Sequence, residues 1–236
     1  METPKFNRLA TRLIGEKAAA TGFTHYKRLY FIRPRNQWTD VFFLDLLRPT
    51  KDSFKVVVGI HIPNVRAKLQ PLYQHDSPTA PISRSVGSRG LEEFWYDFTD
   101  VDSLKAAVDR MWLDFEKFAE PWLKSFNSIR DVADNYFERE IIEENLPGGT
   151  KYFPSPGRWA IYGYLLIEAG NIASGREWLL KAEKLLRKPS FLNKYGQTFY
   201  EKVPGSKEVS LSEDDCRLLE ILNNDLHTNE HIHISP

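Results

Sequence analysis

Two titratable residues on neighbouring predicted strands, Asp45 and His61, are of the types that build a general base. A carboxylate that orients a histidine is a common arrangement in enzymes that move protons. The alternation of strand side chains places both residues on the face that carries Phe43 and Val57. No nucleophile in a matching register accompanies them, and the register itself cannot be read from the sequence. We therefore favour a structural or interface role for this polar pair, with catalysis as the alternative.

Several carboxylates lie close together near residue 140. Metal-binding helix bundles combine such residues with a Glu-x-x-His motif and a second ligand-bearing helix. The sequence has no such histidine here, so the pattern is typical of a solvated acidic face. The carboxylates are Glu138, Glu140, Glu143 and Glu144.

Three histidines near the end of the sequence, His227, His231 and His233, could in principle bind a metal. Two histidines spaced by two, without a cysteine or a further placed ligand, are a weak metal signal, and a polar tail is the simpler interpretation. The glycine-containing segments "GSRG" and "PGGT" lack the Lys-Ser/Thr pair of phosphate-binding loops. The sequence therefore predicts no catalytic residue, no metal site and no cofactor.

The composition is that of an ordinary globular protein, with 236 residues of which 42% are hydrophobic and 27% charged. Basic and acidic residues both number 32, so no global field favours nucleic acid or an anionic membrane. The single cysteine, Cys216, excludes an internal disulfide and suits a reducing compartment. With no apolar run of about 18 residues, we expect a soluble, cytoplasmic protein whose oligomeric state stays open.

The first part of the sequence predicts a helix over residues 4–20, capped by Gly22, and then a sheet. Apolar and polar residues alternate in four segments, which are separated by short polar turns or by one long connection. We expect these segments to form a four-stranded antiparallel meander. The predicted strands cover residues 26–33, 38–47, 54–62 and 92–98.

Helical periodicity dominates the rest of the sequence. A helix beginning near Val101 carries a wide apolar stripe that includes Trp112 and Phe115, and should pack on the sheet until Pro121 ends or kinks it. Beyond the Pro-Gly-Gly segment at 147–149 no strand pattern occurs. The fold class is therefore α+β, with a sheet domain over residues 1–147 and a helical region over residues 150–236.

The long connection at residues 63–90 carries a net charge of plus three, and residues 206–225 carry minus four. Opposite charges suit an internal contact between these segments or association with a partner, and two unrelated solvated surfaces are an equal alternative. Long loops are commonly functional, so we take the basic and aromatic residues of this connection as candidate interaction residues. A single-stranded nucleic acid is an alternative ligand for them, which the neutral net charge disfavours. The candidates are Arg66, Lys68, Tyr73, Arg84 and Arg89.

The order of helix, three strands, long loop, aromatic strand and helix resembles an uncharacterised bacterial family, the domain of unknown function numbered 4304. The resemblance covers about residues 4–146. It implies no catalytic residues, and it implies a protein-binding role because relatives are associated with toxin-immunity and conflict-related genes. The resemblance rests on Gly22-Phe23, on residues 30–33 and 41–44, and on "FKVVVGIHIP", "FWYDFTDVDSL" and "FAEPWLKSF".

Residues 158–187 resemble a single tetratricopeptide-type hairpin of two helices. In that motif small residues let two antiparallel helices approach closely. One copy cannot form a stable stack, so the hairpin should cap or buttress the sheet domain. The matching residues are Trp159, Gly163, Gly170, Gly175, Leu179 and Ala182.

Together these observations predict a non-enzymatic protein-interaction module. The resemblance adds an immunity or accessory role in a bacterial conflict system. Six Trp, ten Tyr and fifteen Phe residues agree with a binding role, because aromatic side chains favour interfaces. The alternatives are an enzyme with a site near Asp45 and His61, and a nucleic-acid binder using the long connection.

Overall fold

A computed structural model describes six segments of the chain. They are residues 3–46, 52–70, 82–86, 94–142, 155–187 and 213–227. Within this part of the chain no helix has the length and apolar character needed to cross a membrane.

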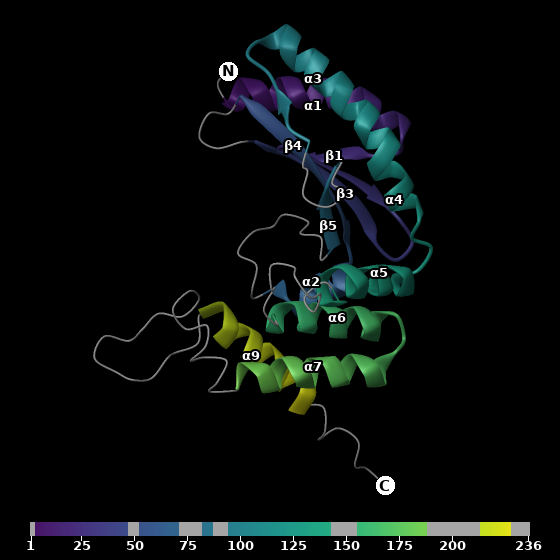
Figure 1. The fold of residues 1–236 in the computed structure, drawn as a ribbon, viewed down its shortest axis with the longest axis vertical. Coiled ribbons are helices and arrows are strands. Elements are labelled where there is room, and N and C mark those ends of the chain that lie inside the picture. The colour runs from purple at the N-terminus through teal and green to yellow at the C-terminus, as the bar shows by residue number, and fades with distance from the viewer. Residues whose placement is uncertain are drawn as a thin grey trace, which may run out of the picture. The chain divides into compact units, whose positions relative to one another are not determined.

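The chain forms two units, whose elements are labelled in Figure 1. The sheet unit contains Met1–Ile62 and Pro78–Asn127, and the helical unit contains Pro63–Ser77 and Ser128–Pro236. This division differs from the predicted boundary at 147–150 in two ways. The helical unit begins about twenty residues earlier, and it also takes in a segment that lies between two strands of the sheet.

The sheet is open and antiparallel, with strand order β1-β2-β3-β4-β5. A short strand, β6, also pairs with β4, opposite Ser53 and Phe54. The meander topology and the antiparallel pairing agree with the prediction. The strands are β1 Thr24–Lys27, β2 Tyr30–Pro34, β3 Thr39–Leu46, β4 Ser53–His61, β5 Ile82–Ser85 and β6 Tyr96–Asp97.

The strand count differs from the four that were predicted. The predicted strand 26–33 is in fact a hairpin, because Arg28 has φ of 50° and turns the chain between β1 and β2. Residues 82–85, expected to be irregular, form β5, and the predicted strand 92–98 is reduced to β6 within its described part. A turn at a non-glycine residue with positive φ has no strong sequence signal, which explains the missed hairpin.

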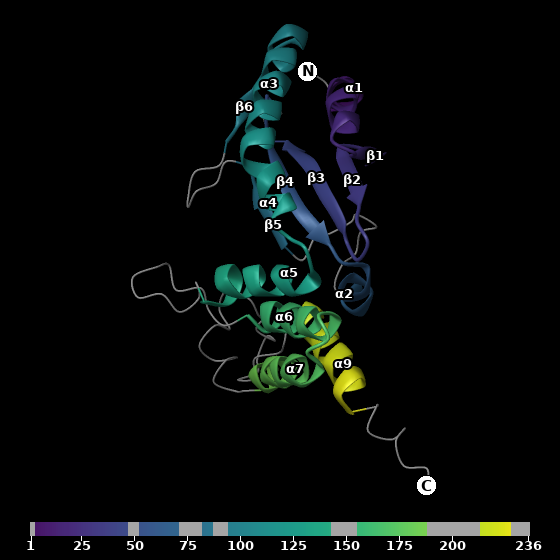
Figure 2. The same ribbon diagram turned by 90° about the vertical axis from the view of Figure 1, so that its right-hand side faces the viewer.

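One face of the sheet is packed by helices. The helix α1 (Thr3–Ala20) places Phe6 6.0 Å from Phe54, between ring centroids. The helix α3 (Val101–Asp114) places Trp112 6.2 Å from Phe42, and both helices lie on the same side of the strands (Figures 1 and 2). Trp112 is 5% exposed and Phe115 is fully buried, which confirms the predicted role of this helix.

Pro121 was predicted to end or kink the helix, and the helical run does not end there. After α3 the backbone widens into a π-helical turn, η2 (Phe115–Ala119), in which the Glu120 N–H donates to the carbonyl of Phe115. A second α-helix, α4 (Glu120–Lys124), then begins, and Pro121 lies in its first turn. A proline is tolerated there because the π-helical turn already interrupts the regular i→i−4 hydrogen-bond pattern next to it. The helical run therefore continues past Pro121, and Glu120 forms an ion pair with Arg33 of β2.

The helical unit contains a short helix, α2, from the segment between β4 and β5, and helices from the second half of the chain. In Figures 1 and 2 the helices α5, α6 and α7 are stacked in chain order, with α9 lying across α7. The two predicted hairpin helices are present, with Gly170 at φ of 83° between them. The bounds are α2 Pro63–Lys68, α5 Ile129–Tyr136, η3 Phe137–Ile142, α6 Pro156–Glu168, α7 Ile172–Leu186 and α9 Glu213–His227.

The helices α6 and α7 approach each other most closely at two glycines. A Cβ atom on Gly175 would lie 2.6 Å from the carbonyl oxygen of Gly163 and 2.5 Å from Cγ1 of Ile167. A Cβ atom on Gly163 would lie 2.7 Å from Cδ2 of Leu179. Each glycine therefore makes room for a large side chain of the opposite helix, as the sequence predicted for this pair.

Candidate functional site

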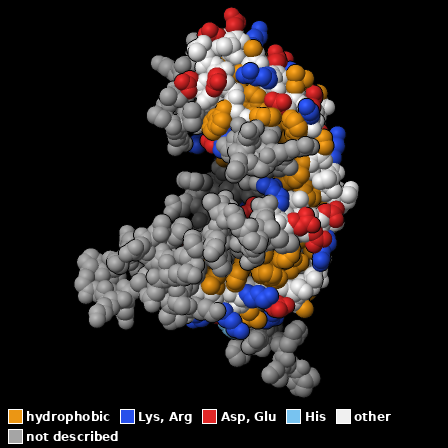
Figure 3. All heavy atoms as spheres, viewed as in Figure 1, with side chains coloured by type: hydrophobic (Ala, Val, Ile, Leu, Met, Phe, Trp, Pro, Cys, Tyr) orange, Lys and Arg blue, Asp and Glu red, His pale blue; other side chains and the backbone are white. Residues whose placement is uncertain are grey.

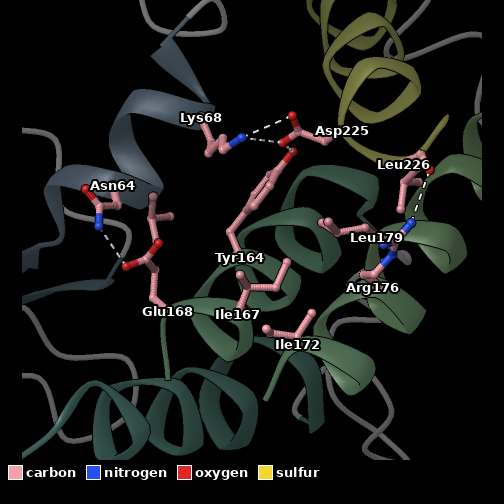
Figure 4. A pocket seen from close by; sticks show the side chains of 11 residues that line it. Asn64, Lys68, Tyr164, Ile167, Glu168, Ile172, Arg176, Leu179, Asp225 and Leu226 are labelled. Carbon is pink, nitrogen blue, oxygen red and sulfur yellow. Dashed lines mark hydrogen bonds and ion pairs between the residues drawn. The ribbon is translucent and has the colours of Figure 1, made fainter. Parts of the chain in front are cut away.

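A pocket in the helical unit, which we call the helical pocket, has a volume of about 200 Å³ (Figure 4). It combines an apolar floor with a polar rim, and residues of α2, α6, α7 and α9 contribute to it. The lining residues are Asn64, Val65, Lys68, Tyr164, Ile167, Glu168, Ile172, Arg176, Leu179, Asp225 and Leu226.

The floor of the helical pocket is formed by the same close approach that joins α6 and α7. Ile167 packs against Gly175, and Leu179 packs against Gly163. Leu179 and Leu226 are each 2% exposed, whereas Ile172, at the start of α7, is 59% exposed. The floor is thus well packed, and Ile172 extends its apolar surface outwards.

A three-residue polar group lies at one side of the pocket. The Lys68 ammonium is 3.1 Å from both carboxylate oxygens of Asp225, and the Tyr164 hydroxyl donates to Oδ2 of Asp225 over 3.0 Å. These side chains come from α2, α9 and α6 and point toward one another (Figure 4). Burial, followed by the charge of Asp225, raises the pKa of Tyr164 above its usual value near 10. The tyrosine therefore stays a neutral hydrogen-bond donor.

Two further contacts complete the rim. Asn64 of α2 donates to Glu168 of α6 over 2.9 Å, and Arg176 of α7 donates to the carbonyl oxygen of Leu226 over 3.2 Å. Leu226 is in the last turn of α9, where carbonyl groups lack intrahelical donors and a cation is favoured. The rim is thus composed of hydrogen-bonded pairs that join all four helices.

The sequence-predicted interaction residues are divided between the two units. Arg66 and Lys68 lie on α2 in the helical unit, and only Lys68 lines the pocket. Arg84 lies on β5 in the sheet unit. Tyr73 and Arg89 lie outside the described residues. Lys68 belongs to the basic segment 63–90 and Asp225 to the acidic segment 206–225. Their ion pair is therefore an internal contact between the two oppositely charged segments.

Asp45 and His61 do not form the predicted pair. Both lie on the expected face, but Asp45 is opposite Lys55 and His61 is opposite Thr39. Six residues separate the two positions along the ladder, which is roughly 20 Å at about 3.4 Å per residue. The face was correctly inferred because side chains alternate strictly along a strand. The pairing was wrong because the register depends on the length of the turn between β3 and β4.

The other titratable candidates are described only in part. His227 is at the end of α9, 3.3 Å from a carboxylate oxygen of Glu183, while His231 and His233 lie outside the described residues. Glu138 and Glu140 are on η3, and Glu143 and Glu144 are again not described. No group of three or more His, Cys, Asp or Glu residues suited to a metal ion occurs in the described segments.

Charged side chains of both signs are interspersed on the face seen in Figure 3. This agrees with the balanced composition of the sequence.

Most residues of the helical pocket were not among the sequence-predicted sites. The available signal was spacing: Tyr164, Ile167 and Glu168 share one face of α6, and Ile172, Arg176 and Leu179 share one face of α7. Spacing alone does not tell a pocket-lining face from a face that is buried in the core.

No family model matches the chain, and no curated protein or solved structure matches it closely enough to indicate a relative. The resemblance to the domain of unknown function numbered 4304 therefore stays a prediction.

Proposed function

We propose that the protein is a non-enzymatic protein-interaction module, and that its helical pocket receives one large apolar side chain of a partner protein. The observation that carries this proposal is the composition of the pocket, in which a packed apolar floor is surrounded by hydrogen-bonded polar and charged groups. Protein interfaces concentrate their binding energy in such places, where an anchoring side chain fills a pocket and a polar rim excludes water.

The size of the pocket supports a side chain rather than a free metabolite. At about 200 Å³ it is smaller than the 300–1,000 Å³ that is typical of small-molecule sites. An aromatic or branched aliphatic side chain suits this volume, and Ile172 would continue the contact beyond the pocket. Burying an apolar surface of about 150 Å² in this way contributes roughly 4 kcal/mol before the entropic cost of association.

The partner should also carry polar groups beside its anchor. The carboxylate of Glu168 and the ammonium of Lys68, which is 53% exposed, flank the floor and remain accessible at the rim. They can accept from, or donate to, main-chain groups of a bound segment, which would fix its direction. The pocket lining has two cations and two carboxylates, so its selectivity comes from shape and hydrogen bonding rather than from net charge.

The resemblance to the domain of unknown function numbered 4304 extends the proposal to the biological setting. An immunity or accessory protein of a bacterial conflict system acts by binding another protein. The abundance of aromatic residues agrees with such a role. The partner itself is defined here by its chemistry, as a protein segment with one bulky apolar anchor.

A peptide-display selection against the full chain tests this function. Wild type should enrich peptides with a large apolar residue at one fixed position. Ile172→Lys should weaken the selected peptides about tenfold or more, since it places a charge at the pocket mouth. Leu180→Lys is the matched control, because Leu180 is exposed on the same helix and does not line the pocket. Equal binding by both variants, or enrichment without an apolar anchor, would refute the proposal.

A further inference from the structure

A buried charge network at the β2–β3 hairpin joins β2, β3, α4 and the segment that follows α1. Arg33 is opposite Asp40 across the hairpin, and Arg35 and Trp38 are each two residues further toward the turn. Because side chains alternate along a strand, all four project from the same face. Asp40 is completely buried, and it accepts hydrogen bonds from Arg33 over 2.9 Å, from Arg35 over 2.9 Å and from Trp38 over 3.0 Å.

Arg33 extends the network to the helices. Its guanidinium donates over 2.8 Å to Glu120 of α4 and over 3.0 Å to the carbonyl of Thr21. It also lies 4.4 Å from the ring centroid of Phe23, as a cation–π contact. Lys124 is 3.1 Å from the same oxygen of Glu120. Arg33 therefore contacts both carboxylates, a main-chain carbonyl and an aromatic ring within the protein.

The charges of this network do not cancel. Two carboxylates, Asp40 and Glu120, face three cations, Arg33, Arg35 and Lys124. The cations outnumber the carboxylates by one, and the excess lies on the outer groups, since the side chain of Arg35 is 31% exposed and that of Lys124 is 65% exposed. This excess of positive charge leaves the outer guanidinium of Arg35 able to attract a further anion.

A second pocket, the hairpin pocket, lies where Arg35 reaches the surface. It has a volume of about 510 Å³ and is lined by residues of the β2–β3 turn and of the segment that follows α4. Arg35 uses Nε for Asp40, and its two Nη groups have no hydrogen-bond partner among the described residues. The lining residues are Pro34, Arg35, Asn36, Gln37, Trp38, Phe126 and Asn127.

We propose that the hairpin pocket is a binding site for a ligand that bears a carboxylate. Arg35 is held in place by a fully buried partner, so little side-chain entropy remains to be lost on binding. Its two Nη groups present a planar pair of donors that matches the two oxygens of a carboxylate. The amides of Asn36 and Gln37, both exposed, supply further donors around the same space. This site is independent of the helical pocket and of the function proposed for it.

Nuclear magnetic resonance titration of the full chain with sodium acetate tests this site, with sodium chloride holding ionic strength constant. The Arg35 Nε–Hε resonance and the side-chain amides of Asn36, Gln37 and Asn127 should shift together and saturate. Arg35→Lys keeps the charge but removes the planar pair of donors, so it should weaken binding about tenfold. Lys105→Gln removes an exposed charge of α3 and should leave the affinity unchanged.

Three results would overturn the proposal. The first is an acetate titration that does not saturate, and the second is equal affinity in wild type and Arg35→Lys. The third is tighter binding of inorganic phosphate than of acetate at the same ionic strength, which would exclude carboxylate selectivity. A second variant, Gln37→Ala, does not touch the charge network, so it keeps the test valid if Arg35→Lys unfolds. It should weaken acetate binding by about threefold through loss of one neutral hydrogen bond.

Discussion

Substitution of Gly175 by alanine tests the close approach that builds both the helical hairpin and the floor of the helical pocket. The added Cβ would lie 2.5 Å from Cγ1 of Ile167 and 2.6 Å from the carbonyl oxygen of Gly163. The side chain of Ile167 could move, but the carbonyl belongs to the backbone of α6. The two helices must therefore separate by several tenths of an ångström, which loosens the whole contact.

The expected size of the effect follows from two opposing contributions. Overpacking of this kind costs about 3 kcal/mol, at the upper end of the usual range, because backbone atoms are involved. Alanine has a higher helix propensity than glycine, which offsets about 1 kcal/mol. The net loss in the free energy of unfolding is then about 2 kcal/mol, or a fall of roughly 4–8 °C in the Tm of a chain of this length.

Gly15 provides the control for this experiment. It lies within α1, and a Cβ atom added there would meet no atom within 4 Å. Gly15→Ala should therefore raise stability by about 0.5–1 kcal/mol. Thermal unfolding followed by far-ultraviolet circular dichroism compares the two variants. A Gly175→Ala protein that melts at or above the wild-type temperature would show that the helices do not approach as described.

Other substitutions probe the sheet unit. Asp40→Asn should lower the free energy of unfolding, measured in urea, by about 3–5 kcal/mol, because it leaves guanidinium groups without their buried carboxylate. The control, Lys17→Gln, breaks an exposed ion pair and should cost less than about 1 kcal/mol. Burial alone raises the pKa of Glu120, but the hydrogen bonds and positive charges of Arg33 and Lys124 together outweigh it, so the folded pKa lies below the usual value of 4.5. The stability that this ion pair contributes is complete above about pH 4.5 and is lost as the pH falls through the folded pKa of Glu120. Glu120→Gln should therefore flatten the acid limb of a stability–pH curve. An unchanged acid limb would contradict the pairing of Glu120 with Arg33. Trp112→Ala should cost about 3–5 kcal/mol by denaturant unfolding, and a loss below 1 kcal/mol would mean that α3 does not pack on the sheet.

The local features of the fold were determined by the sequence. The span of α1, its end at Gly22, the stripe of α3 and the glycine pair of the hairpin all follow from spacing within a few turns of chain. Helical and strand periodicities are properties of neighbouring residues, so they can be recognised without knowledge of the partner element. For the same reason the face of Asp45 and His61 could be predicted.

The candidate sites were decided by tertiary structure. Lys68 and Asp225 are 157 residues apart in sequence, and Arg33 and Glu120 are 87 apart, so no local pattern connects them. The register of β3 and β4 separated Asp45 from His61, and the π-helical turn before Pro121 placed Glu120 against the sheet. Both depend on which turn conformation lets the remaining side chains pack, and that is settled only when distant segments meet.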